Sequence, residues 1–172
     1  MCGIIGYTGK LAAAPVLIEG LKRLEYRGYD SAGLAVVADE HMYQVKSVGK
    51  VAQLEAVAGQ QPELKKLAGC GIAHTRWATH GAPSTLNAHP HLDESGRFAV
   101  VHNGIIENYQ ELRKHLEGKG VHFRSQTDSE VIPHLIAGAY EGDLLSAVAA
   151  ALKQLDGTYG IAVISSLEPG VV

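Results

Sequence analysis

The chain has 172 residues, enough for one compact domain but too few for two domains with separate cores. Hydrophobic residues make up 46% and charged residues 19%, and its 20 glycines exceed the usual share of about 7%. This composition indicates a globular chain with many turns rather than a disordered one. The net charge of −3 and the lack of a basic run argue against a nucleic-acid partner, and we expect a small ligand.

No segment approaches the ~18 consecutive apolar residues of a membrane span. The N-terminus, MCGIIGYTGK, lacks the basic start and long apolar core of a signal peptide. We therefore expect a cytoplasmic protein with no membrane partner. Cys2 and Cys70 are too few for a disulfide scaffold and no CxxC pair occurs, so both thiols are expected to be reduced.

Short apolar runs bounded by Gly, Asp or Asn predict buried strands along the chain. The predicted strands cover 3–7, 32–38, 70–74, 98–102 and 159–165, with a weaker partner strand at 41–48. Apolar positions one turn apart predict helices between them. The predicted helices contain Leu17, Leu21 and Leu24, and cover 108–117, 129–140 and 144–155. The order fits layered α+β rather than a regular βαβ fold.

Two polar stretches, 59–66 and 80–97, are predicted to be loops, and the second is long enough to carry a site. Thr127-Asp128-Ser129-Glu130 has the form of a capping box before the helix at 129–140. Pro133 is compatible with that helix only near its first turn. The start of this helix therefore stays open.

The first chemical signal is Met1-Cys2-Gly3. Removal of Met1 would leave a thiol and a free α-amine on Cys2, and the amine can accept the thiol proton near neutral pH. The alternative is that Cys2 only begins a buried strand, since free cysteines are often buried. These residues alone do not decide between the two.

Five sequence motifs taken together favour the interpretation of Cys2 as a nucleophile. They are CGIIGYTG at 2–9, LKRLEYRGYDSAGLAV at 21–36, HTRWATHGAPSTLNAHPH at 74–91, VHNGIIENY at 101–109 and SQTDSEVI at 125–132. In this order, they closely resemble the N-terminal glutaminase domain of the glucosamine-6-phosphate synthases, a class II amidotransferase family. The resemblance implies an N-terminal-nucleophile hydrolase fold, a four-layer αββα sandwich of two antiparallel sheets.

The resemblance also implies how glutamine is bound. Arg76 would hold the α-carboxylate through two charge-assisted hydrogen bonds, and Asp128 would take the α-ammonium. Thr79, His80 and the backbone near Gly104 would make further contacts. By residue type alone, Arg76 is equally compatible with a surface cation and Asp128 with a helix cap.

Asn103-Gly104 follows an apolar run and offers an amide donor beside an unhindered backbone N–H, which suits an oxyanion hole. The alternative is a hairpin turn, because Asn-Gly is a leading turn dipeptide. The resemblance favours the catalytic interpretation. It places Arg27 and Gly28 beside the N-terminal Cys as supporting residues. It places Trp77 in a loop that covers the glutamine site, although Trp77 also fits an ordinary core aromatic.

The implied mechanism is attack by the Cys2 thiolate on the glutamine amide, with a γ-glutamyl thioester that water then hydrolyses. No cofactor is required. Several histidines could suggest a metal, but they lack HExxH or carboxylate-flanked spacing, and no metal is expected. These histidines are His74, His80, His89, His91 and His102. Cys70, which begins an apolar run, is predicted to be a buried hydrophobe rather than a second nucleophile.

We expect residues 2–172 to form one glutaminase domain, truncated and with an incomplete fold at its C-terminal end, because the family's domain continues beyond the equivalent of Val163. The family's sugar-isomerase domains, which receive ammonia and convert fructose 6-phosphate to glucosamine 6-phosphate, are the expected partner, in a homodimeric full-length enzyme. Two alternatives stay open. One is a glutaminase domain of purine synthesis, which YRGYDSAG and HTRWATHG argue against, and the other is a non-catalytic fragment that binds glutamine.

Overall fold

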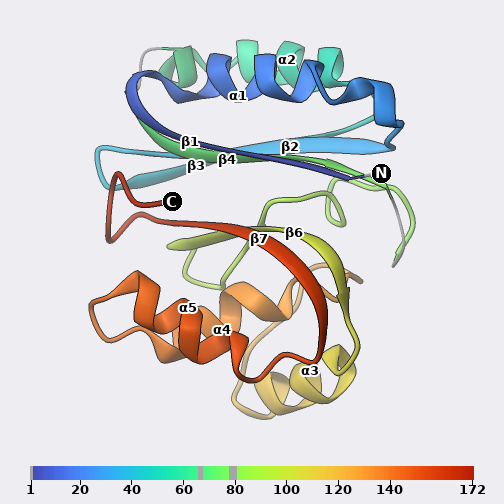
Figure 1. Ribbon diagram of the computed structural model, residues 1–172, viewed down its shortest axis with the longest axis vertical. Helices are drawn as coiled ribbons and strands as arrows, with labels where there is room; N and C mark the ends of the chain where they lie inside the picture. Colours follow the sequence, from blue (N-terminus) through green and yellow to red (C-terminus); the bar gives the residue numbers. More distant parts are fainter. Residues whose placement is uncertain (1, 66–67, 78–80) are drawn as a thin grey trace.

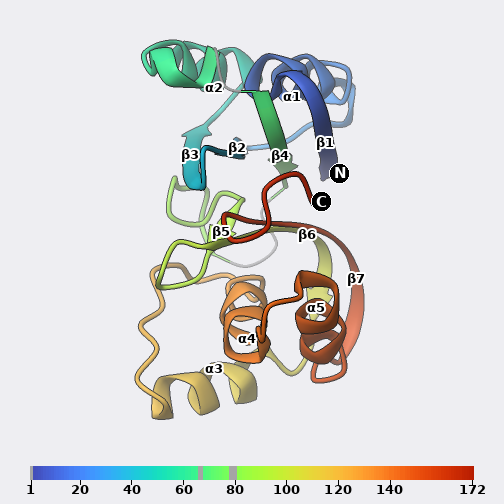
Figure 2. The same cartoon turned by 90° about the vertical axis from the view of Figure 1, so that its left-hand side faces the viewer.

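The structure is a computed structural model that describes residues 2–65, 68–77 and 81–172. Two antiparallel sheets lie face to face, and helices cover the outer face of each sheet (Figure 1). Figure 2, the view turned by 90°, shows the same order of helices, sheet, sheet and helices. The α+β fold with four αββα layers, predicted above, is therefore confirmed.

The first sheet has the strand order β1-β4-β2-β3. Its strands are β1 (Gly3–Ala12), β2 (Ser31–Ala38), β3 (His41–Val48) and β4 (Ala68–Arg76). Helices α1 (Ala13–Lys22) and α2 (Val51–Gly59) cover its outer face, and short 3₁₀ turns span Glu25–Arg27 and Pro62–Lys65. Strand β4 is central, because it pairs with β1 on one side and β2 on the other.

The second sheet has the order β5-β6-β7. Its strands are β5 (His91–Leu92), β6 (Phe98–Ile106) and β7 (Gly157–Ser165). The helices on its outer side are α3 (Tyr109–Gly118), α4 (Val131–Ala139) and α5 (Leu144–Leu152). Most predicted strands and helices thus lie where the apolar pattern placed them, although β1 is longer than the expected strand.

Three apolar clusters hold the layers together, one under each helix layer and one between the sheets. The cluster between the sheets consists mainly of small or branched side chains. It contains Ala35, Val37, Cys70, Ile72, Ala99, Val101 and Ile164. Cys70 is fully buried there, as the sequence predicted. Burial raises the pKa of its thiol, which keeps the group protonated and unreactive.

Two local predictions were wrong. Helix α2 was not predicted, although its buried residues Val51, Leu54 and Ala58 have helical spacing. The capping box at Thr127–Glu130 does not form, because α4 begins later and the N-cap Glu130 makes no side-chain cap bond. The Glu130 carboxylate instead accepts hydrogen bonds from the backbone of the preceding turn. Pro133 lies in the first turn of α4, where a missing N–H is tolerated.

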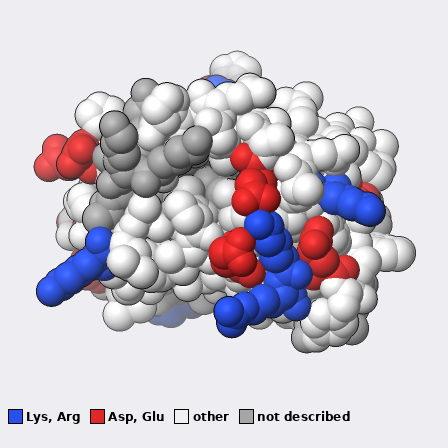
Figure 3. Space-filling view, turned by 90° about the horizontal axis from the view of Figure 1, so that it is seen from above, with Lys and Arg blue, Asp and Glu red and all other residues white. Residues whose placement is uncertain are grey.

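The outer face of the α1–α2 layer carries side chains of both charge signs without a field of one sign (Figure 3). Lys22 forms ion pairs of 2.9 Å with Glu19 and 3.0 Å with Glu55, which joins the two helices. Among the described residues, none of the helices is long and apolar enough to cross a membrane.

Candidate active site

A cavity of about 380 Å³ lies where the ends of β1, β4 and β6 meet. It brings together six residues that the sequence analysis singled out, from four separate segments. They are Cys2, Arg76, Trp77, Asn103, Gly104 and Asp128. Residues with no predicted role also line it: His74, His89, His102, Ile105, Ser129 and Thr158. The cavity is the candidate active site.

Cys2 lies immediately before β1 and is half-buried. Its Sγ accepts a hydrogen bond of 3.2 Å from the backbone N–H of Trp77, and the next amide, that of Gly3, donates to the hydroxyl of Thr75 at 3.1 Å. Both partners lie at the end of β4, so the register of β1 on β4 fixes the thiol. The alternative that Cys2 only begins a buried strand does not fit this position. Met1, whose removal was expected, lies outside the described residues.

Asn103 and Gly104 lie inside β6, not in a turn, so the hairpin alternative is wrong. The backbone N–H of Glu107 bonds to Asp156, which places odd-numbered residues of β6 in the hydrogen-bonded pairs with β7. The N–H of Gly104 therefore points away from β7. The same holds for Ile106, whose N–H donates to Asp128 at 2.9 Å. Gly104 thus directs its N–H to the strand edge where Asp128 lies.

Glycine is required at position 104 for two reasons. Its φ of 141° is a conformation that side-chain-bearing residues rarely adopt. A Cβ atom there would lie 1.9 Å from the carbonyl oxygen of Thr158 on β7. The sequence therefore places the unhindered backbone N–H of Gly104 next to the side-chain amide of Asn103 within β6.

Arg76 and Asp128 are both buried, with exposed fractions of 4% and 3%. The Arg76 guanidinium donates to the carbonyl of Gly81 at 3.2 Å and lies 4.0 Å from the carboxylate of Asp30. Asp128 accepts from the backbone of β6 and caps no helix. The alternatives of a surface cation and a helix cap are therefore wrong, and both charges face the cavity that holds Cys2.

Trp77 is 55% exposed, which excludes the alternative of a core aromatic. Gly28 lies directly beside it, because a Cβ on Gly28 would be 3.0 Å from the Trp77 ring. Gly28 ends the short turn Glu25–Arg27 and has a φ of 70°. Arg27 directly precedes Gly28 in this turn. Its backbone is therefore next to the residue that packs against Trp77. Thr79 and His80, the other predicted glutamine contacts, lie outside the described residues.

Four buried histidines form a group at the cavity, and His74, His89 and His102 line it. The ring centroids of His74 and His89 are 4.3 Å apart, those of His89 and His91 are 4.6 Å apart, and His102 lies beyond at 6.5 Å from His89. Burial lowers the pKa of all four, that of His74 to about 4, so the rings are neutral at pH 7. Within the described residues, no three His, Cys, Asp or Glu side chains are arranged to hold a metal ion.

His74, His91 and His102 each hydrogen-bond a segment of the site. His74 contacts Asn103 at 2.7 Å, His91 contacts Thr127 at 3.0 Å and His102 contacts Ser129 at 2.8 Å. The sequence analysis considers these histidines only as possible metal ligands, rejects that interpretation and gives them no other role. The available signal was their spacing, since His74 is two residues before Arg76 and His102 directly precedes Asn103.

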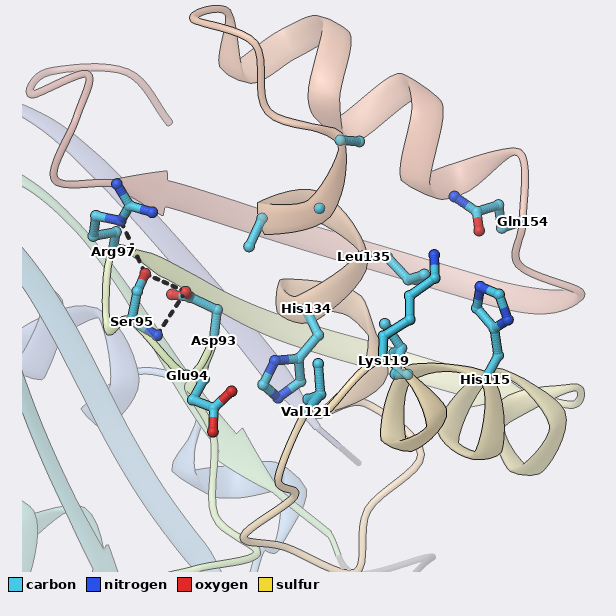
Figure 4. Close-up of a pocket in the computed structure, with 14 residues that line it drawn as sticks. Asp93, Glu94, Ser95, Arg97, His115, Lys119, Val121, His134, Leu135 and Gln154 are labelled. Carbon is cyan, nitrogen blue, oxygen red and sulfur yellow. Dashed lines mark hydrogen bonds between the residues drawn. The ribbon is translucent and has the colours of Figure 1, made fainter.

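A second cavity, of about 620 Å³, lies between α3, α4 and the β5–β6 turn (Figure 4). Asp93 and Arg97 lie at one end, whereas His115 of α3 and Lys119, which directly follows α3, lie at the other. The Asp93 carboxylate already accepts from the amides of its own turn, at Ser95 and Phe98. This cavity holds neither the thiol nor the charge pair of the first.

An accessible thiol beside a chain terminus, placed between two antiparallel sheets of an αββα stack, defines the architecture of an N-terminal-nucleophile hydrolase. The sequence model of the glutamine amidotransferase domain matches residues 74–171, more than half of the chain. The chain therefore belongs to the glutamine amidotransferase domain family. This family assignment agrees with the site geometry described above.

Relatives and solved structures agree with this assignment. The chain is 60% identical over 171 residues to glutamine–fructose-6-phosphate aminotransferase of Symbiobacterium thermophilum and 55% identical over 170 residues to that of Aquifex aeolicus. Both alignments cover 98% of this chain. They cover only 27% and 28% of the two relatives, so the chain spans little more than a quarter of their length. Glutamine phosphoribosylpyrophosphate amidotransferase from B. subtilis matches with a TM-score of 0.76 at 27% identity, over 96% of this chain and 35% of that one.

Proposed function

We propose that the chain hydrolyses L-glutamine to glutamate and ammonia through a thioester on Cys2. One observation carries the proposal: a half-buried thiol, a buried cation, a buried carboxylate and a strand-edge amide line the same cavity. Arg76 and Asp128 have the opposite charges needed for the α-carboxylate and α-ammonium of a free amino acid. No cofactor is needed for this chemistry.

The proposed reaction begins when the α-amine of Cys2, freed by removal of Met1, takes the thiol proton. Sγ then bonds to the side-chain carbonyl carbon of glutamine, and the resulting oxyanion accepts hydrogen bonds from the Asn103 side chain and the Gly104 N–H. The carbon–nitrogen bond breaks as the departing nitrogen takes the proton, and ammonia leaves. Water, deprotonated by the same amine, cleaves the thioester to glutamate and restores the thiol.

Supporting positions follow from the contacts. Arg27 and Gly28 would order the nucleophile segment, since Gly28 lies against Trp77 and the Trp77 amide donates to Cys2. The Trp77 side chain would cover bound glutamine, and Thr79 and His80 would add contacts to it. These roles agree with the exposed Trp77 ring at the cavity.

We further propose that residues 2–172 supply nitrogen to fructose 6-phosphate in a longer, homodimeric protein with sugar-isomerase domains. The names of the 60% and 55% identical relatives support this acceptor. The alternative of purine synthesis has less support, because the solved amidotransferase that acts on phosphoribosylpyrophosphate is only 27% identical to this chain. A chain that binds glutamine without hydrolysing it is the remaining alternative.

The test is the intact mass of the purified chain after incubation with a diazoketone analogue of glutamine, beside Cys2→Ala. A mass lacking Met1 and carrying one adduct that Cys2→Ala abolishes is the expected result. Release of ammonia from glutamine by the parent chain completes the assignment. An unlabelled chain that still binds glutamine would overturn hydrolysis in favour of the binding alternative.

A further inference from the structure

One hydrogen bond joins the two sheets at the candidate active site. His74 belongs to β4 in the first sheet and Asn103 to β6 in the second, and His74 Nε2 lies 2.7 Å from Asn103 Oδ1. His74 is 1% exposed. The ring is therefore shielded from bulk solvent, although His74, like Asn103, lines the cavity that holds Cys2.

The chemistry of the two groups fixes the direction of this bond. A side-chain carbonyl oxygen only accepts hydrogen bonds, so the Asn103 oxygen requires a proton on His74 Nε2. Burial, with smaller contributions from His102 and Arg76, lowers the pKa of His74 to about 4. The ring is thus neutral at pH 7 and has a single N–H. That proton is on Nε2, and Nδ1 has none.

The donor direction also determines which end of the Asn103 amide is available. With Oδ1 held by His74, Nδ2 is left to donate into the cavity. The flipped amide would present its oxygen to a developing oxyanion, which is repulsive rather than stabilising. The two orientations have nearly the same shape, so packing alone discriminates poorly between them. A fixed donor behind the amide discriminates between them directly.

We propose that His74 is a positioning residue that holds the Asn103 amide with its nitrogen, rather than its oxygen, towards the reacting carbonyl oxygen. The inference rests on the proposed glutaminase function and deepens it. In this role His74 acts through Asn103 rather than on the reacting atoms.

The surrounding residues hold the His74 ring in place. The His89 ring packs against it in a tilted arrangement with a centroid distance of 4.3 Å, and the His91 ring contacts His89 edge-on at 4.6 Å. The backbone carbonyl of His89 lies where a Cβ on Gly33 of β2 would be, at 2.1 Å. The segment carrying His89 is therefore seated closely on the sheet, and it leaves the His74 ring little freedom to turn.

The first test compares His74→Phe with His74→Gln. Phe keeps the planar ring but has no N–H, whereas the Gln side chain can return a donor near the position of Nε2. We expect His74→Phe to lower kcat by about 10- to 100-fold, less than the roughly 100- to 1,000-fold known for outright loss of an oxyanion-hole donor, because Asn103 itself is retained. The glutamine Kd is expected to change less than about 3-fold, as Asn103 acts on the transition state. His74→Gln is expected to recover part of kcat.

Two controls separate positioning from a merely structural role. His134→Phe replaces another buried histidine, in α4 against Phe123, and is expected to leave kcat unchanged. In an Asn103→Ala background, His74→Phe is expected to have almost no further effect, because its target is absent. Equal losses of kcat in both backgrounds, or equal losses for Phe and Gln, would overturn the proposal.

A second test does not depend on turnover. Long-range ¹H–¹⁵N correlations on a histidine-labelled chain report which ring nitrogen is protonated, and the signals missing from His74→Phe assign the residue. We expect a proton on Nε2 of His74 and none on Nδ1. A proton on Nδ1 would overturn the orientation argument, even in an active chain. Failure of the parent chain to release ammonia, with Nε2 protonated, would instead count against the glutaminase function.

Discussion

The backbone N–H of Trp77 donates a 3.2 Å hydrogen bond to the Sγ of Cys2, linking the residue after β4 to the residue before β1. A sulfur that accepts such a bond is held at the cavity and remains accessible. The second thiol, Cys70, is fully buried between the sheets. The two cysteines are therefore predicted to differ in reactivity.

Iodoacetamide is expected to alkylate Cys2 and to leave Cys70 unmodified in the native chain, because only Cys2 is accessible. Peptide mass mapping checks the site, and the same reaction in denaturant, where both thiols should react, is the control. Modification of Cys70 at the rate of Cys2 under native conditions would contradict the packing of the sheets.

Gly104→Ala is expected to destabilise the chain by about 1–3 kcal/mol, because the new Cβ meets the Thr158 carbonyl and the backbone φ is unfavourable. Displacement of the N–H should also lower kcat by about 100-fold or more. Urea unfolding and ammonia release measure the two effects. Gly160→Ala on the neighbouring strand has open space for its Cβ and serves as the matched control. Similar losses in both variants would rule out the specific role of Gly104.

Arg76→Lys is expected to weaken glutamine binding by about 10- to 100-fold, since an ammonium cannot replace the planar two-donor contact to a carboxylate. Calorimetric titration of glutamine gives the Kd. Arg23→Lys changes an exposed arginine next to α1 and should leave the Kd unaltered. The assignment of Arg76 to the α-carboxylate fails if the Kd of Arg76→Lys equals that of the parent.

The buried histidines predict a loss of stability in acid. Their folded-state pKa values are depressed, that of His74 to about 4, against about 6.5 in the unfolded chain. The unfolded chain therefore binds more protons in this window. The free energy of unfolding is highest above pH 6.5 and falls towards pH 4, by up to about 1.4 kcal/mol per pH unit for each such histidine.

Urea unfolding between pH 7 and 4.5 measures this slope. His89→Phe removes one titrating ring, neither nitrogen of which has a hydrogen-bond partner among the described residues, and should make the slope shallower. His41→Phe changes an exposed histidine and should leave the slope unchanged. An unaltered slope in His89→Phe would mean that its protonation does not limit folding.

Asp143→Ala is expected to cost about 1 kcal/mol of stability without affecting kcat. The Asp143 carboxylate accepts from the Ser146 N–H at 2.8 Å and caps the N-terminus of α5, which is remote from Cys2. Thermal unfolding measures this loss of stability. Asp143→Asn can still cap the helix and should keep most of the stability of the parent chain. A change in kcat would reveal coupling between α5 and the site.

The sequence predicted strands and most helices well, because buried runs such as 98–102 are bounded by turn residues and have no competing helical pattern. It missed α2, whose apolar stripe is short and consists of Val51, Leu54 and Ala58. It also failed at Thr127–Glu130, where the Glu130 carboxylate binds a preceding turn that no local pattern reveals.

The candidate site was predicted largely through the resemblance of motifs, since Arg76 and Asp128 individually suit ordinary surface or capping positions. Their burial at one cavity depends on the packing of two sheets. The pairing of His74 with Asn103 joins residues 29 positions apart on different strands. The spacing of His74 from Arg76 indicates that His74 lies near the site, but its contact with Asn103 exists only once the sheets are stacked.

Strand β4 carries His74 and Arg76, and it is followed directly by the amide that binds Cys2. It lies between β1 and β2, with backbone ladders on both sides. Loosening this part of the site requires breaking two ladders at once, which normally happens only when the whole sheet opens. Amide protons of β4 should therefore exchange among the slowest in the chain, and catalytic competence should end with global unfolding rather than before it.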